Sequence, residues 1–253
     1  MRPFRFLEAA GHYTFFAIRI FSAMPSIIGR VPELLSQLGN VLLGALPLGV
    51  AAGLALGIVV WIHFRSALED VGGPGALQYL PQGLALAVVL EFAPLSAGLI
   101  IAGRSGSSLG AELGCMRLTE QIDALEALGS SPLNKLVVPR VLACVLALPL
   151  LTVFVSYLGI GSGYLAEAVG GSLSWMQFAN ETLHVLTLRK VIPATLKTLV
   201  FGYLIGVTGC YFGLHATGGT EGVGQAATRA VVVSTFLVLV SNVIMVRLIQ
   251  LWM

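Results

Sequence analysis

The residues best suited to chemistry inside the apolar part of this sequence are one acid and one base, Glu91 and Lys197. Each lies within a long apolar segment, where an isolated charge costs at least about 2.5–3.5 kcal/mol to place in a membrane. If both segments are helices that cross the membrane in opposite directions, the two side chains lie at similar depth, roughly 10–14 Å from one membrane face. We therefore expect a neutral Glu91–Lys197 pair with a structural or gating role. The alternative is that Lys197 extends to the interface and Glu91 is protonated.

A second pattern with possible chemistry is Gly103-Arg104-Ser105-Gly106, which fits the G-x-S-G of rhomboid-type intramembrane proteases. His215 is the candidate base for such a site. Only three positions of the motif are fixed, so chance matches are common in a sequence rich in glycine and serine. Ser105 also falls where an apolar segment ends, beside a charge that favours the interface. An intramembrane protease is kept as an alternative on these grounds only.

Other catalytic groups are scattered or missing from the sequence. The three cysteines and the histidines have none of the spacings of a metal site, so we expect no metal and no cofactor. No G-x-x-x-x-G-K-[ST] motif is present, so ATP chemistry would need a separate subunit. We expect a protein that is not itself an enzyme.

Composition sets the elements that must position these residues. The chain is 57% hydrophobic and 10% charged, with a mean hydropathy of +0.91, as in integral membrane proteins. A net charge of +2 gives no indication of nucleic acid as a partner. We predict one all-α polytopic membrane domain over residues 1–253. Its five transmembrane helices are predicted at residues 41–64, 82–104, 141–166, 191–217 and 230–250.

Three segments have further local signals. Residues 1–38 are rich in aromatic residues interrupted by charges, which predicts a helix lying in the membrane interface, with a short hydrophobic hairpin arm as the alternative. In the first span Gly49, Gly53 and Gly57 form a small-residue face for close helix packing, either within the subunit or across a dimer. Pro94 predicts a kink near Leu90 in the second span. Residues 167–190 are expected to form a polar connection.

Residues 105–135, between spans two and three, have the densest run of charge in the sequence. Leu109 and Leu113 fall on one helical stripe, whereas Ile122 and Leu125 fall nearly opposite. One straight helix cannot bury both stripes against a single surface, so we expect a break between positions 114 and 117. A short charged helix would follow, with either a solvated face or a contact with a soluble partner.

Positive charge predicts the orientation of the chain. Loops on the side of the N-terminus hold nine lysines and arginines, and those on the other side hold four. The positive-inside rule therefore places the N-terminus and residues 105–135 in the cytoplasm. With five spans, the C-terminus is predicted to face the periplasm.

Several of these segments resemble one family. The runs E-F-A-P, A-G-R-S-G-S-S-L-G-A-E-L-G, M-R-L-T-E-Q-I-D-A-L-E-A-L-G and L-V-V-P-R are similar to the signature of MlaE-type permeases, the membrane subunits of ABC transporters that move lipids with MCE proteins. A second block, Cys210 to Arg229, resembles the segment before the family's last span. The resemblance covers most of the chain after residue 80.

The resemblance implies a bacterial inner-membrane permease that moves phospholipid between that membrane and a periplasmic MCE-domain partner. It implies a homodimer bound to two copies of an ABC ATPase, and it makes residues 105–135 a cytoplasmic coupling segment. The residues it assigns to the ATPase contact are Arg117, Thr119, Glu120, Gln121, Asp123 and Glu126. An ATP-independent secondary transporter of a hydrophobic solute remains the main alternative.

The resemblance also bears on the intramembrane charges. It places Glu91 and Lys197 in a polar cluster of the family. The family often has arginine directly before this glutamate, where the sequence has Leu90. Without that cation the pair is neutral, so binding of a lipid headgroup there is less strongly implied than pairing.

Overall fold

The computed structural model describes residues 3–171 and 173–252, and every regular element in them is a helix. Five helical segments are long and apolar enough to cross a membrane, which confirms the prediction of an all-α fold with five spans. The first is α2 (Val31–Gly72), and the third, fourth and fifth contain α7 (Val138–Gly170), α9 (Leu188–Leu214) and α10 (Gly219–Trp252). The second segment, residues 75–118, begins within the 3₁₀ helix η2 (Pro74–Tyr79) and continues through α3 (Leu80–Ala87), η3 (Val88–Phe92), α4 (Ala93–Ile101), η4 (Ala102–Gly106) and α5 (Ser107–Leu118).

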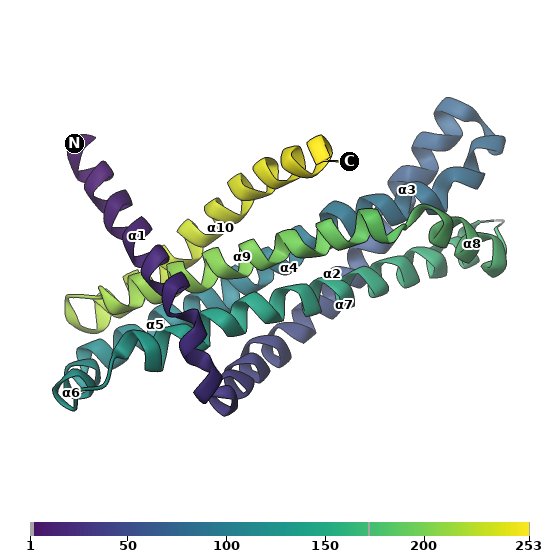
Figure 1. The fold of residues 1–253 in the computed structure, drawn as a ribbon. Coiled ribbons are helices and arrows are strands. Elements are labelled where there is room, and N and C mark those ends of the chain that lie inside the picture. The colour runs from purple at the N-terminus through teal and green to yellow at the C-terminus, as the bar shows by residue number, and fades with distance from the viewer. Residues whose placement is uncertain (1–2, 172, 253) are drawn as a thin grey trace.

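The second, third and fourth segments run beside one another along the length of the molecule, and α2 crosses them at a shallow angle (Figure 1). Leu84, Ala97, Leu148 and Phe201 are fully buried where these helices meet. The last helix, α10, packs on α5 and α9 and then diverges from the bundle towards the C-terminus (Figure 1). Only 17% of its most apolar stretch is buried inside the molecule, against half of the corresponding stretch in the third and fourth segments. A long apolar face of α10 is therefore left uncovered.

Close contact between α2 and α7 depends on the glycines of the first span. A Cβ on Gly53 would lie 3.0 Å from the Val155 carbonyl oxygen, and one on Gly49 would lie 2.8 Å from a methyl group of Leu151. At Gly57 a Cβ would overlap the backbone of α7. Small residues therefore let the two backbones approach closely. The three glycines pack within the subunit.

The second span contains two π-helical turns. One of them, η3, lies where the sequence predicts a kink: Ala93 donates its N–H to the carbonyl of Val88, five residues back. Pro94 has no N–H and cannot continue the ordinary four-residue pattern, so the wider turn accommodates it. The second π turn, η4, contains Arg104 and Ser105. π turns of this kind occur often at functional sites.

The N-terminal segment is α1 (Pro3–Ala23) followed by the 3₁₀ helix η1 (Met24–Gly29). The helix α1 crosses one end of the bundle and contacts α9 (Figure 1). The hydroxyl of Tyr13 lies 2.9 Å from that of Thr208, and Tyr203 donates to the carbonyl of Ala17. Residues 31–38, assigned to the interfacial segment from sequence, form the first turns of α2. Residues 1 and 2 of that segment lie outside the described residues.

The expected polar connection at 167–190 is largely helical. The helix α7 continues to Gly170, and α8 (Trp175–Val185) follows. Ser174 and Gln177 form a capping box at the start of α8, a signal present in the sequence as S-x-x-Q. Phe178 is buried, and Gln82 donates to the Glu181 carboxylate at 2.5 Å. These contacts hold α8 against the start of the second span.

Candidate functional site

The structure brings Glu91 and Lys197 together in the interior of the bundle. Glu91 lies in the π turn η3 and Lys197 in the first half of α9. The Lys197 Nζ atom is 3.0 Å from Glu91 Oε1. Lys197 is almost completely buried, whereas the Glu91 side chain is 39% exposed. In the isolated chain Lys197 is therefore buried, whereas Glu91 is partly accessible from outside the bundle.

The backbone supplies a second partner for the buried ammonium group. Lys197 Nζ donates to the carbonyl oxygen of Leu90 at 2.7 Å. In an α-helix that oxygen would accept from the residue four positions later, which here is Pro94, and proline has no N–H. One proline thus makes available the carbonyl that binds the lysine.

A third side chain joins this cluster from α10. The Asn242 amide donates to Glu91 Oε2 at 3.2 Å, and the amide oxygen of Asn242 is buried without a hydrogen-bond partner. Glu91, Lys197, Asn242 and the Leu90 carbonyl, here called the Glu91 cluster, therefore connect the second, fourth and fifth spans. Sequence reasoning missed Asn242, although an amide in the last apolar span was a visible signal.

The Glu91 cluster can hold a neutral ion pair in a nonpolar environment and exchange its hydrogen bonds with a polar ligand. Pairing reduces the cost of both charges, and loss of either partner leaves the other uncompensated. No group of three or more potential metal ligands occurs among the residues that the structure describes.

The charged segment after the second span contains a sharp break, but at a different place from the one expected. The helix α5 runs without interruption through residues 114–117 and ends at Leu118, so the predicted position was wrong. The chain turns at Glu120, which has a left-handed φ of 59°, and α6 (Gln121–Ala127) follows. Thr119 donates its hydroxyl to the Cys115 carbonyl at 2.9 Å and closes the last turn of α5. This hydrogen bond stabilises the end of α5 beyond the point at which its apolar residues change from one side of the helix to the other.

The helix α6 stands at one end of the bundle (Figure 1), and its polar residues are exposed. Ile122 is buried, and Arg117 forms an ion pair with Asp123. Every residue assigned from sequence to the ATPase contact is exposed, namely Arg117, Thr119, Glu120, Gln121, Asp123 and Glu126. The structure therefore leaves all six residues at the surface of the isolated chain, with Arg117 and Asp123 paired to each other.

A second ion pair stabilises the same end of the bundle. Arg140, at the start of α7, donates to Glu112 of α5 at 2.5 Å and to the Leu136 carbonyl at 2.8 Å. Arg140 is buried, whereas Glu112 is half exposed. The pair ties together the two helices on either side of α6.

The elements of a serine protease do not come together. The Ser105 hydroxyl oxygen is buried without a hydrogen-bond partner. The His215 Nδ1 atom lies 2.7 Å from the Tyr211 carbonyl of its own helix. No hydrogen bond within 3–171 and 173–252 connects the two residues, although a nucleophile and its base need that contact. The geometry therefore gives no support to an intramembrane protease.

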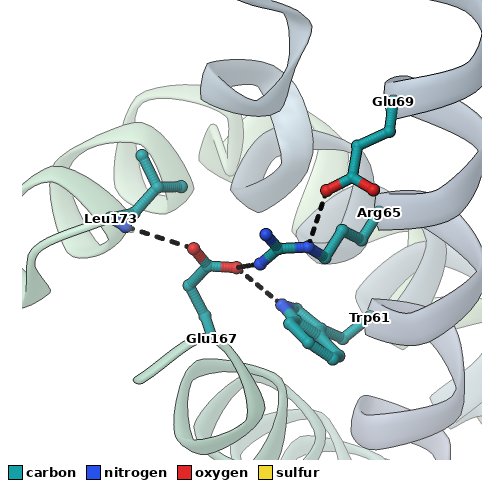
Figure 2. A network of polar contacts seen from close by, with 5 residues as sticks. All are labelled: Trp61, Arg65, Glu69, Glu167 and Leu173. Carbon is teal, nitrogen blue, oxygen red and sulfur yellow. Dashed lines mark hydrogen bonds and ion pairs between the residues drawn. The ribbon is translucent and has the colours of Figure 1, made fainter. Parts of the chain in front are cut away.

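The opposite end of the bundle contains a polar cluster that sequence reasoning also missed (Figure 2). Glu167 of α7 is buried and accepts from the Trp61 indole at 2.7 Å and from the Leu173 N–H at 3.1 Å. Arg65 lies 3.6 Å from the same carboxylate and pairs with Glu69 at 2.9 Å. These contacts join the end of α2 to the end of α7.

Comparison with known proteins places this architecture among transport proteins. The family model "Permease MlaE" matches residues 34–248. A probable ABC transporter permease protein of Rickettsia felis is 33% identical over 98% of this chain and 94% of its own length. A probable ABC transporter permease protein of Synechocystis is 40% identical over 66% of this chain and 64% of its own. The chloroplastic protein TRIGALACTOSYLDIACYLGLYCEROL 1 of Arabidopsis thaliana is 41% identical over 60% of this chain and 43% of its own.

Proposed function

Because this chain belongs to the MlaE permease family and is a membrane permease subunit of an ABC transporter, we propose that its substrate is a phospholipid. The Glu91 cluster is the observation that carries this proposal. It is a compact polar site between apolar spans, suited to a polar headgroup whose acyl chains remain among apolar side chains. The Arabidopsis relative carries the name of a glycolipid, trigalactosyldiacylglycerol, which supports a lipid as the general class of substrate.

We propose that the lipid passes between the inner membrane of a bacterium and a periplasmic MCE-domain protein. The positive-inside count supports an orientation with the N-terminus and α6 in the cytoplasm and the C-terminus in the periplasm. In this orientation the Glu91 cluster lies in the periplasmic half of the second span. A lipid bound there would be close to the side on which the MCE partner would receive it.

The ATPase is proposed to bind at α6. The exposed acids are Asp123 and Glu126 of α6 and Glu120 directly before it, and Ile122 anchors the helix to the bundle. We propose that the permease is a homodimer with two ATPase subunits, and the uncovered apolar face of α10 supports a second copy as its neighbour. Phe236 and Val243 on that face are each more than 60% exposed.

The proposal is tested by transport in proteoliposomes. The permease is reconstituted with its ATPase, and transfer of a fluorescent phospholipid to the MCE-domain protein is followed with and without ATP. We expect transfer that needs both ATP and the ATPase, and that falls at least about tenfold in Glu91→Gln, as expected when a buried charge loses its partner. Equal transfer by the permease alone would instead support an ATP-independent transporter. Co-extraction of a different lipid class would correct the substrate.

A further inference from the structure

A cavity of about 290 Å³ lies between the first turns of α2 and the second span, towards the end of the bundle that carries α6. Six of its eight lining residues are polar, namely Gln37, Asn40, Arg104, Ser105, Ser108 and Glu112. Arg104 is thirteen residues beyond Glu91 on the same helical segment, or about 20 Å along its axis. The cavity is therefore separate from the Glu91 cluster.

Arg104 brings a positive charge to this cavity without an acidic partner. Its guanidinium group lies against Gly44 of α2, where a Cβ would overlap it, and donates to the Asn40 carbonyl at 3.3 Å. None of the ion pairs found in the described part of the chain includes Arg104. A guanidinium has five N–H donors in a planar fork that matches phosphate oxygens. Most of these donors remain available to a ligand.

Ser105 gives a second and independent indication of a ligand. The residue is 3% exposed, and its hydroxyl oxygen is buried without a hydrogen-bond partner. A buried polar atom in this state costs about 1–3 kcal/mol, so such atoms normally have a partner. Ser105 lies beside Arg104 in the π turn η4 and lines the same cavity.

The remaining polar groups leave the cavity with an excess of one positive charge. Glu112 is neutralised by its ion pair with Arg140 at 2.5 Å, so Arg104 is the uncompensated charge. The amides of Gln37 and Asn40 and the hydroxyl of Ser108 add neutral donors to the walls. Several donors around one net cation suit a ligand with one negative charge and several acceptor oxygens.

We propose that this cavity binds a phosphate group, as carried by the phosphodiester headgroup of a membrane lipid in the leaflet at the α6 end of the bundle. The position supports a lipid as the source, because Arg104 stands at the predicted boundary of the second span. The apolar residues Val41 and Leu109 complete the walls, as expected of a site that also meets the first carbons of a lipid. Free phosphate shares the same chemistry and is distinguished by the experiment.

The test maps binding by photocrosslinking to the full-length permease, assembled with its ATPase in nanodiscs. The probe is a phosphatidylglycerol analogue with a diazirine on its headgroup, and crosslinked peptides are located by mass spectrometry. We expect crosslinks in the segments around residues 37–41 and 104–112. Arg104→Gln should reduce them about tenfold or more, as expected for loss of a charge-assisted hydrogen bond, and Arg104→Lys should retain part of them.

One control variant and three competing compounds test whether the crosslinks depend on Arg104 and on the phosphate group. Arg229→Gln removes an exposed cation of α10 that does not line the cavity, and crosslinking should be unchanged. Short-chain phosphatidylglycerol should compete with the probe, whereas diacylglycerol should not. Competition by inorganic phosphate at an equal concentration would support the site but assign it to a soluble anion. Equal crosslinking in wild type and in correctly assembled Arg104→Gln, or equal competition by diacylglycerol, would overturn the proposal.

Discussion

Lys197 and Glu91 are 3.0 Å apart, yet their surroundings are unequal, because the lysine side chain is 1% exposed and that of the glutamate 39%. The ammonium group depends on Glu91 and on the Leu90 carbonyl, whereas the carboxylate can also be reached from outside the isolated chain. The two members of the pair should therefore respond differently to substitution.

Neutralising Glu91 should cost more stability than neutralising its partner. Glu91→Gln leaves a buried ammonium group, whereas Lys197→Met leaves a partly exposed carboxylate. We expect a lower thermal unfolding midpoint in detergent for Glu91→Gln. The double mutant should recover about 0.5–3 kcal/mol relative to the sum of the single changes. Strictly additive losses would contradict a direct coupling between the residues.

The amide of Asn242 should matter through its hydrogen bond to Glu91. Asn242→Leu removes a donor to a carboxylate, a contact of about 1.5–3 kcal/mol, and should slow lipid transfer about tenfold or more. Ser241→Ala is the matched control, because the Ser241 hydroxyl donates to the Val238 carbonyl of the same helix and not to Glu91. Transfer should be near the wild-type rate in the control. Similar rates in both variants would exclude a special role for Asn242.

Charge reversal on α6 should weaken the ATPase contact without preventing insertion. Glu120→Lys, Asp123→Lys and Glu126→Lys together change the exposed face, while Ile122 still anchors the helix. Complementary charge guides association more than folding, so co-purification of the ATPase should decrease strongly and depend on salt. Glu221→Lys at the start of α10 is the control. Wild-type recovery of the ATPase by the triple variant would remove the acidic face from the interface.

Orientation can be tested with two cysteines in a variant without the native ones. A cysteine at Val71, which is 91% exposed, should react with an impermeant thiol reagent added to intact spheroplasts. One at the exposed Ser131 should react only after the membrane is opened. The reverse labelling would overturn the positive-inside assignment.

The glycines of α2 should tolerate a methyl group only outside the contact with α7. Gly57→Ala places a Cβ into the backbone of α7 and should destabilise the fold by about 1–3 kcal/mol. Gly39→Ala, in the same helix, meets nothing within 4 Å and should have no such cost. Thermal stability in detergent measures the difference. Equal unfolding midpoints for the two variants would show that the close contact between α2 and α7 does not contribute to stability.

Hydropathy and charge predicted the five spans, because both are local properties of the sequence. The depth of Glu91 and Lys197 could also be calculated from helix rise once the spans were known. The hydrogen bond of Asn242 to Glu91 and the π turns could not be predicted from the sequence, because each depends on how separate helices pack. The contact of Arg65 with Glu167 had one signal, since the two charges directly follow spans that end on the same side.

The contacts of Glu167 with Trp61, Arg65 and Leu173 have a mechanical consequence. Together with the contacts of the α2 glycines, they join α2 to the half of α7 that lies away from α6, and we expect the two helices to move as one unit. The near end of α7 continues from η5 (Leu133–Val137), the element that follows α6 in the chain. A displacement of α6 would then be transmitted along α7, over about 50 Å, to the opposite end of the bundle. The two helices would tilt against the second span, whose π turns η3 and η4 make it the less regular neighbour.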